Sequence, residues 1–373
     1  MSVWLALFFS LQSYALTVDD LVIQSEQALL KSVELSAQEV QEDLELLNLA
    51  LREGYEGPDF HSRLRSISLE RLSPEKLCAE ISSILDSVAN AHLRASLDFK
   101  SCGRAPVLGQ VGVNLAAGFN GWKFDVIDGV SVVAIPSFWP DFDVRWNGLL
   151  AKIKELRALN QPFVLDLRGN PGGDDSFGFE LARILLGADA KAVLPTPVLR
   201  REFRQTPAAF ALQANSWTWN ALKLRNEGKP VPAAIDQRRN EILNWMERAK
   251  HHEFPDHYEE RLNPAPLDKT KVFDKNVYVL VDHGCASSCE NTIQLLESLT
   301  HRVLVGENTF GAVEYGEVGR VLLPHSKISI GLTTMSVKFR DGRQPEKIGY
   351  APDVKVNPGK DALKQAIKLI QGK

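Results

Sequence analysis

Apolar residues recur at near-helical spacing through the first part of the chain. Leucines between residues 21 and 51 follow this spacing among Glu and Gln. A second pattern, over residues 73–88, begins with Ser73 and Pro74, which suit the cap and the first turn of a helix. We therefore predict that the chain is mainly helical from about residue 16 to residue 96.

Beyond residue 107 the pattern changes to short apolar runs that alternate with amphipathic ones. The run "PFVLDL" precedes the turn "RGNPGGDD" and the helical pattern "SFGFELARILLG". Later, "VYVLVD" precedes the turn "HGCA", the helical pattern "SSCENTIQLLESLT" and the strand "RVLVG". Strand, turn and helix in alternation indicate an α/β core.

Residues 194–269 interrupt this alternation and predict two helices. Thr206 and Pro207 form a cap pair, and the apolar Phe210 and Trp217 follow at heptad spacing. Long insertions in α/β enzymes often cover the active site. The alternative is a peripheral addition to the fold.

The N-terminus resembles a secretory signal peptide that ends near residue 15. The apolar run Val3 to Leu11 precedes the small residues Ser13 and Ala15, and no charged residue stands before Asp19. The usual basic n-region is missing, so a packed helix or a membrane anchor are the alternatives. Because a bilayer span takes about 20 apolar residues, we expect no stable membrane span. The resemblance to a signal peptide leads us to expect an exported protein, periplasmic or extracellular.

Four cysteines stand in this chain, and an even number in an exported protein indicates disulfides. Cys78 and Cys102 lie in one local segment and are the favoured pair. Cys285 and Cys289 could also pair, which geometry decides. The net charge of −4 does not favour a nucleic-acid partner.

Two strand-to-helix turns carry the candidate chemistry. In "DLRGNPGGDDS", residues 166–176, successive N–H groups could form a concave donor site next to a positive helix end. The turn has neither a good nucleophile nor a phosphate-binding Lys. An oxyanion hole is therefore a better hypothesis than a nucleotide site, with a plain tight turn as the alternative.

The second turn, "VDHGCASSCEN", spans residues 281–291 and offers several reactive side chains. Ser287, Ser288 and Cys285 are the candidate nucleophiles, and His283 is a candidate base. A nucleophile at such a turn projects from the strand end, and the next backbone N–H can serve as an oxyanion donor. The Gly-x-Ser-x-Gly pattern is absent.

Four motifs in order resemble the C-terminal processing (tail-specific) serine peptidases. They are "VLDLRGNPGG", "VYVLVDHGCASSCEN", "VLVGENTFG" and "EKIGYAPDV", and the resemblance covers about residues 132–354. It implies a ClpP/crotonase-like α/β catalytic core of repeated strand-strand-helix units, with an N-terminal helical domain and a helical insertion. The expected division is 1–15 signal peptide, 16–102 helical domain carrying the catalytic His, 103–193 first part of the core, 194–269 helical insertion, and 270–373 second part of the core with a C-terminal helix.

The resemblance also implies a set of site residues. Its nucleophile stands three residues before the Glu of Ser-x-x-Glu, which is Ser287 here. Ala312 occupies the position where the Ser/Lys branch of the family carries its base. The chain is therefore closer to the Ser-His-Glu branch, which includes the tricorn core and the chlamydial protease-like activity factor. That branch implies His92 as base and Glu346 as its partner.

The oxyanion donors implied by the same match are the N–H groups of Gly172 or Gly173 and of Ser288. Asn90 stands where an acidic residue often precedes the His. Residues 102–132 are too few for the PDZ module that many relatives carry.

The expected function is an exported serine endopeptidase that acts on a protein or peptide and needs no cofactor or metal. His251, His252, Glu253 and His257 do not fit the zinc motif, because the spacing is one residue too long and a proline interrupts it. The alternatives are a carrier of apolar, retinoid-like ligands on the same fold and a small-ester hydrolase. An oligomer, with the C-terminal helix at a contact, is a further expectation.

Overall fold

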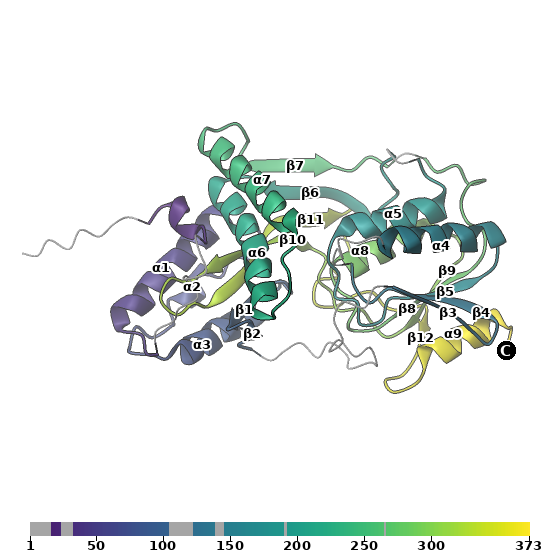
Figure 1. The fold of residues 1–373 in the computed structure, drawn as a ribbon, viewed down its shortest axis with the longest axis horizontal. Coiled ribbons are helices and arrows are strands. Elements are labelled where there is room, and N and C mark those ends of the chain that lie inside the picture. Colours follow the sequence, from purple (N-terminus) through teal and green to yellow (C-terminus); the bar gives the residue numbers. More distant parts are fainter. Residues whose placement is uncertain (1–15, 24–32, 104–121, 139–144, 190–191, 265) are drawn as a thin grey trace, which may run out of the picture.

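The computed structural model describes residues 16–23, 33–103, 122–138, 145–189, 192–264 and 266–373. The predicted signal peptide therefore lies outside the described residues. Two six-stranded sheets occupy the two halves of the molecule (Figure 1). We call them the core sheet and the lobe sheet.

The core sheet is built from six short strands. They are β3 Lys123–Ile127, β4 Val130–Ala134, β5 Phe163–Asp166, β8 Val277–Val281, β9 Arg302–Gly306 and β12 Val354–Lys355. Their order is β12-β9-β8-β5-β4-β3, and every pair is parallel except β3 with β4. The predicted α/β core is confirmed.

Helices cover both faces of the core sheet. They are α4 Arg145–Leu159, α5 Asp175–Leu186, α8 Ser288–Leu295 with the 3-10 turn η3 Leu296–Ser298, and α9 Ala362–Ile370. Helices α4, α5 and α8 pack on one face and the C-terminal α9 on the other (Figure 1). Burial on both faces explains why the central strands are continuous apolar runs rather than alternating ones.

The lobe sheet combines strands from three distant parts of the chain. They are β1 Arg94–Leu97, β2 Lys100–Ser101, β6 Val198–Arg204, β7 His257–Arg261, β10 Tyr315–Leu322 and β11 Ser329–Phe339. The order is β2-β1-β11-β6-β7, with β10 on the other edge of β11, and every pair is antiparallel.

Helices from the N-terminal region and from the insertion surround the lobe sheet. They are η1 Val18–Leu21, α1 Ala37–Glu53, α2 His61–Leu64, α3 Pro74–Asp86, α6 Pro207–Asn226 and α7 Ala233–Lys250. Helix α3 begins after Ser73, whose hydroxyl accepts a hydrogen bond from Lys76 N, and α6 begins after Thr206 in the same way. Both predicted caps are confirmed.

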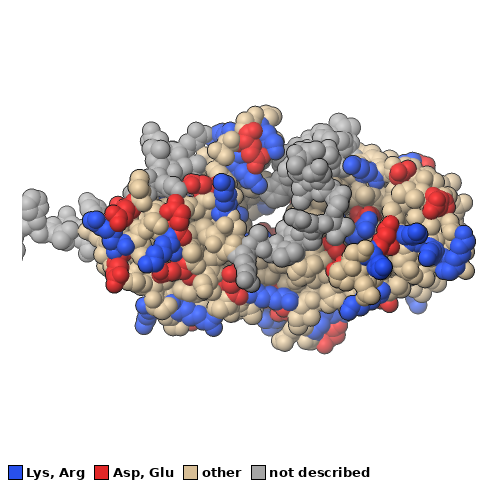
Figure 2. All heavy atoms as spheres, turned by 90° about the horizontal axis from the view of Figure 1, so that it is seen from below, with Lys and Arg blue, Asp and Glu red and all other residues tan. Residues whose placement is uncertain are grey.

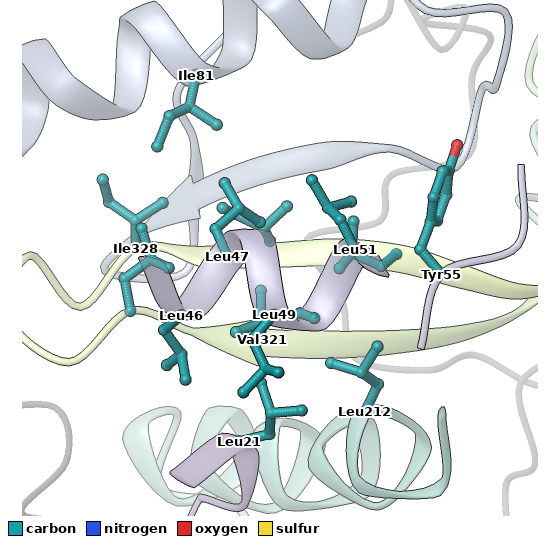
Figure 3. Close-up of a cluster of buried hydrophobic side chains, with 14 of the residues drawn as sticks. Leu21, Leu46, Leu47, Leu49, Leu51, Tyr55, Ile81, Leu212, Val321 and Ile328 are labelled. Atoms are coloured by element: carbon teal, nitrogen blue, oxygen red, sulfur yellow. The ribbon is translucent and has the colours of Figure 1, made fainter. Parts of the chain in front are cut away.

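The largest apolar cluster of the lobe joins helices from distant parts of the chain. Leu46, Leu47, Leu49 and Leu51 of α1 lie among side chains of α3, α6 and the β10–β11 hairpin (Figure 3). Burying one such leucine stabilises the fold by about 1.5–3 kcal/mol. The N-terminal helices, the insertion and the β10–β11 hairpin therefore form one packed unit.

The structure adds strands to two parts of the expected division. The N-terminal helical region also contributes β1 and β2, and the helical insertion also contributes β6 and β7. These strands are short, and β1 and β6 pair with β11, more than a hundred residues later in the chain. Hydrophobic periodicity detects local order, so it could not reveal them.

Candidate active site

The two turns singled out in the sequence lie side by side at the C-terminal ends of β5 and β8. Ala286 N donates a hydrogen bond to Asn170 O at 3.0 Å. The buried Asp282 carboxylate accepts from Gly169 N and Gly284 N, both at 2.8 Å. Because β5 and β8 are neighbouring parallel strands, their two turns meet at one edge of the sheet.

Ser287 occupies a strained position at the start of α8. Its φ is 55° and its ψ is −121°, which is unusual for a residue with a side chain. Such conformations persist only where the surroundings hold them, and they cluster at functional sites. Ser287 is also the nucleophile that the Ser-x-x-Glu motif implies.

The fully buried Glu290 holds this turn against the segment 309–312. Its carboxylate accepts hydrogen bonds from Ser287 N at 3.2 Å, and from Gly311 N and Ala312 N at 2.8 Å each. Burial raises its pKa and these bonds oppose the rise. The Glu of the Ser-x-x-Glu motif thus joins the backbone of the nucleophile turn to the backbone of residues 311–312.

His92 lies beside Ser287, although 195 positions separate them in the sequence. Its ring atom Nε2 is 3.2 Å from Ser287 Oγ, and its backbone N–H donates a hydrogen bond to Asn90 Oδ1 at 3.0 Å. Among the described residues, the buried Nδ1 has no hydrogen-bond partner. Desolvation, followed by the charge of Arg94, lowers the pKa of His92 to about 4, so the ring is neutral and can accept a proton at neutral pH.

The Glu346 carboxylate lies beside the backbone that precedes His92, and its hydrogen bonds go to main-chain groups. Oε1 accepts from Ala91 N at 2.6 Å, and Oε2 accepts from Val313 N at 3.1 Å and Glu314 N at 2.9 Å. Desolvation raises the pKa of Glu346 to about 7 in spite of these bonds. The direct bond from Glu346 to the imidazole, which the triad hypothesis implies, is therefore not formed in this structure.

The two glycines expected at the oxyanion hole differ in what they can do. Gly172 N donates to Asn170 Oδ1 at 2.8 Å, so this N–H is already used. Gly172 instead permits close approach: its φ is +91°, and a Cβ there would lie 2.7 Å from Ala286 O and 2.8 Å from Ser288 N. Within the described part of the chain, the N–H groups of Gly173 and Ser288 have no acceptor.

Both cysteine pairs are joined by disulfides. Cys78 pairs with Cys102, and Cys285 pairs with Cys289 across the five-residue segment that contains Ser287. Cys285 therefore has no free thiol, which argues against a cysteine nucleophile.

The structure does not pair the other candidates with His92 or Ser287 in the way a nucleophile or base requires. His283 is exposed, with its ring centroid 5.1 Å from that of Phe310. Ser288 Oγ donates to Gly173 O at 2.8 Å, so its hydroxyl is engaged.

The His-rich run shows no metal centre. It spans the end of α7 and the start of β7, where His257 Nε2 lies 3.1 Å from Arg204 Nη1. The described residues include no group of three His, Cys, Asp or Glu side chains that could hold a metal ion. They also include no helix that is both long and apolar enough to cross a bilayer.

Three polar residues that the sequence motifs do not mark as functional help to build the site. Asn90 and Asn170 are fully or almost fully buried and bond to the backbone of His92 and Gly172, respectively. Asp282 joins the two turns. Their only sequence signal is their position inside or next to the motifs, since a buried amide cannot be told from an exposed one by composition.

A strained serine at a strand-to-helix turn, a histidine within reach and two N–H groups without an acceptor among the described residues have the arrangement expected of a serine hydrolase site. Comparison with known families agrees: residues 129–356 match the model of peptidase family S41. This match covers more than half of the chain, so the chain belongs to peptidase family S41 and is a serine-type peptidase.

Comparison with solved structures finds similar chains at low sequence identity. A candidate peptidase from Parabacteroides merdae is 14% identical with a TM-score of 0.53, and the match covers 90% of this chain and 97% of that one. Mature CPAF is 20% identical with a TM-score of 0.38, over 63% of this chain and 49% of that one. The photosystem II D1 C-terminal processing protease is 18% identical with a TM-score of 0.36, over 65% of this chain and 50% of that one. No curated protein matches the chain.

Proposed function

We propose that this chain is an exported endopeptidase of the tail-specific type, with Ser287 as nucleophile and His92 as general base. One observation carries the proposal: Nε2 of His92 lies 3.2 Å from Oγ of Ser287. A serine hydroxyl is a weak nucleophile until a neighbouring base accepts its proton. The neutral imidazole at this distance meets that need.

The reaction proceeds through an ester on Ser287. Oγ attacks the peptide carbonyl carbon while Nε2 of His92 takes the hydroxyl proton. The C–N bond then breaks and the amine leaves with that proton. A water molecule, deprotonated by the same Nε2, hydrolyses the ester and restores Ser287.

The charge that develops on the carbonyl oxygen needs hydrogen-bond donors. The N–H groups of Gly173 and Ser288 flank the nucleophile and have no other acceptor among the described residues. Loss of one such donor costs about 2.7–4 kcal/mol of transition-state stabilisation in other hydrolases. Gly172 supports this site by its size rather than by its N–H.

Glu346 acts on His92 through the backbone. Its carboxylate binds Ala91 N, so it fixes the residue that precedes the base. Its negative charge, when present, also favours the imidazolium that forms during catalysis. This role places Glu346 as a positioning residue in the resting enzyme.

Two features support export. Both disulfides suit an oxidising compartment, and residues 1–15 have the pattern of a signal peptide.

Basic and acidic side chains are interspersed over the face shown in Figure 2. The substrate under this proposal is a protein or peptide.

A fluorophosphonate probe followed by peptide mapping tests the proposal. We expect labelling at Ser287 that is lost in Ser287→Ala and in His92→Ala. Ser288→Ala should still be labelled at Ser287, which separates the two neighbouring serines. Absence of labelling in the folded protein would contradict the proposal and favour an apolar-ligand carrier. Casein digestion compared with hydrolysis of a simple ester then separates a peptidase from an esterase.

A further inference from the structure

The backbone segment 311–314 connects the nucleophile turn with the segment that carries the base. Its first two N–H groups donate to the Glu290 carboxylate at 2.8 Å each, and its last two donate to that of Glu346 at 3.1 Å and 2.9 Å. Glu290 also accepts from Ser287 N, and Glu346 also accepts from Ala91 N. Two carboxylates thus bind four consecutive N–H groups, one carboxylate on the side of the nucleophile and one on the side of the base.

Glu314, the last residue of this segment, forms a reciprocal pair with Glu346. Glu314 N donates to Glu346 Oε2 at 2.9 Å, and Glu346 N donates to Glu314 Oε1 at 3.1 Å. Each carboxylate therefore accepts the backbone N–H group of the other residue. The pair holds the main chain of Glu346 as well as its side chain, and an ionised acceptor makes such hydrogen bonds stronger than neutral ones.

The reciprocal pair is anchored to the lobe sheet. Glu314 directly precedes β10, and its carbonyl oxygen accepts a hydrogen bond from Val337 N of β11 at 2.8 Å. Strand β11 is in turn paired with β1, β6 and β10. Glu346 is therefore held from the sheet, and not only from the loop that carries His92.

The two paired carboxylates also repel each other. Both side chains are half-buried, and desolvation is the main cause of the rise in the pKa of Glu346 to about 7, to which the charge of Glu314 adds. Further titratable groups near Glu346, among the described residues, belong to Tyr55 after α1, Tyr315 of β10, His92 and Lys347. Burial raises the pKa of both tyrosines and lowers that of His92 to about 4, so these three are uncharged near neutral pH, and the Lys347 ammonium donates to Asp86 O. Near neutral pH the charge of Glu314 therefore opposes the ionisation of Glu346.

We infer that Glu314 is a second positioning residue for the reaction: its carboxylate fixes the backbone of Glu346, and Glu346 in turn fixes Ala91, the residue before the base. The bonds of Glu314 lead to Glu346 and to β11, so it acts on His92 only through these neighbours. Proton transfer from Ser287 depends on the 3.2 Å between its Oγ and Nε2 of His92, so a small displacement of the base slows the reaction. The inference rests on the proposed function, since it assigns a role in the same reaction.

The rate at which a fluorophosphonate labels Ser287, measured from about pH 5.5 to about pH 8.5, tests this role. Glu314→Ala removes the acceptor of Glu346 N, so we expect labelling at about pH 8 to be about tenfold slower, the scale of one hydrogen bond to a charged group. Glu314→Gln keeps an acceptor oxygen and removes the charge, so its rate at that pH should stay within about twofold of the unmodified protein. Because a neighbouring negative charge is lost, the rise of the rate with pH should move to lower pH in both variants.

A second measurement does not depend on activity. Hydrogen exchange of the Ala91 amide reports on its bond to Glu346, and in Glu314→Ala it should be at least about fivefold faster than in the unmodified protein. Glu314→Gln should restore the protection. Glu45→Ala and Glu45→Gln, on the exposed side of α1, are the matched controls and should change neither the exchange nor the labelling rate. Thermal unfolding of each variant shows whether it is folded at the assay temperature.

Three results would overturn the inference: labelling and exchange in Glu314→Ala that match the unmodified protein, a Glu314→Gln variant that is as slow as Glu314→Ala, or a slower rate whose pH profile does not move, which indicates a purely structural role. Labelling of Ser287 in the unmodified protein tests the proposed function separately. If Ser287 is labelled and the Ala91 amide exchanges alike in all variants, only the role of Glu314 is lost. If Ser287 is not labelled, the proposed function is lost, and the exchange rates still decide whether Glu314 holds the segment before His92.

Discussion

The Glu346 carboxylate accepts a hydrogen bond from Ala91 N at 2.6 Å, one residue before His92. This contact joins the segment after β11 to the loop that carries the base. It also buries a carboxylate whose pKa desolvation raises to about 7. The ionisation of Glu346 should therefore govern activity near neutral pH.

The first prediction is that kcat/KM rises with pH through an apparent pKa near 7. His92, with a pKa of about 4, is already neutral in this range, whereas Glu346 becomes charged only as the pH passes about 7. In Glu346→Gln we expect a lower rate and a flat profile from about pH 6 to pH 8. A rise near pH 7 that persists in this variant would contradict the assignment.

The same shift predicts how stability depends on pH. The pKa of Glu346 is higher in the folded state than the usual value of 4.5, so the folded protein retains a proton that the unfolded chain releases. The contribution of Glu346 to stability is thus lost as the pH rises from about 4.5 to about 7. Denaturant unfolding of wild type and Glu346→Gln at pH 4.5 and pH 8 should show a relative change of roughly 2–4 kcal/mol in favour of the variant.

The second prediction concerns Asn90, which is buried and holds the backbone of His92. Its amide bonds His92 N, Thr333 Oγ1 and Tyr55 Oη. Asn90→Ala should lower the free energy of unfolding by about 1–3 kcal/mol and lower kcat, because a buried donor and acceptor lose partners. Asn240→Ala, on the exposed face of α7, is the control and should change neither quantity measurably.

The third prediction concerns the disulfide around the nucleophile. The double variant Cys285→Ala, Cys289→Ala should lose about 2 kcal/mol of stability, given the short loop that this bond closes. It should also lose activity, because Ser287 would be free to leave its positive φ. The matched control replaces Cys78 and Cys102, which should lower stability by about 3 kcal/mol and leave kcat less affected. Equal kcat losses in both double variants would contradict a specific effect on the nucleophile turn.

The fourth prediction separates backbone strain from close approach at Gly172. Gly172→Ala places a Cβ 2.7 Å from Ala286 O, next to the nucleophile, so we expect a large loss of activity and a loss of stability of about 2 kcal/mol or more. Gly129→Ala is a matched control: its φ of +77° is similar, but nothing lies within 4 Å of the added Cβ. Steady-state kinetics and thermal unfolding of the two variants distinguish the effects. Comparable kcat values in both would show that the contact with the nucleophile turn does not matter.

Much of the core could be predicted from local patterns. Strands β5 and β8 are buried on both faces and appear as apolar runs, and each precedes a turn and an amphipathic helix. The motif spacing also selected Ser287, because Glu290 stands one helical turn further on. The structure shows why that spacing matters, since Glu290 accepts the backbone N–H of Ser287.

The lobe sheet could not be predicted in the same way. Strand β1 has four residues and pairs with β11, which is more than two hundred residues away. Pairing at such distance depends on the whole fold, whereas periodicity reports only on neighbours in the chain.

The sequence by itself determined the order of strands, turns and helices in the core, the nucleophile turn and the caps of α3 and α6, because each depends on residues within a few positions of one another. Only the tertiary structure decided what surrounds Ser287. It set His92 within 3.2 Å of the hydroxyl, bonded Glu346 to Ala91 rather than to the imidazole, and used the N–H of Gly172 inside its own turn. These outcomes follow from competition among hydrogen-bond donors and acceptors that the fold brings together, and that competition is not encoded in any single stretch of the chain.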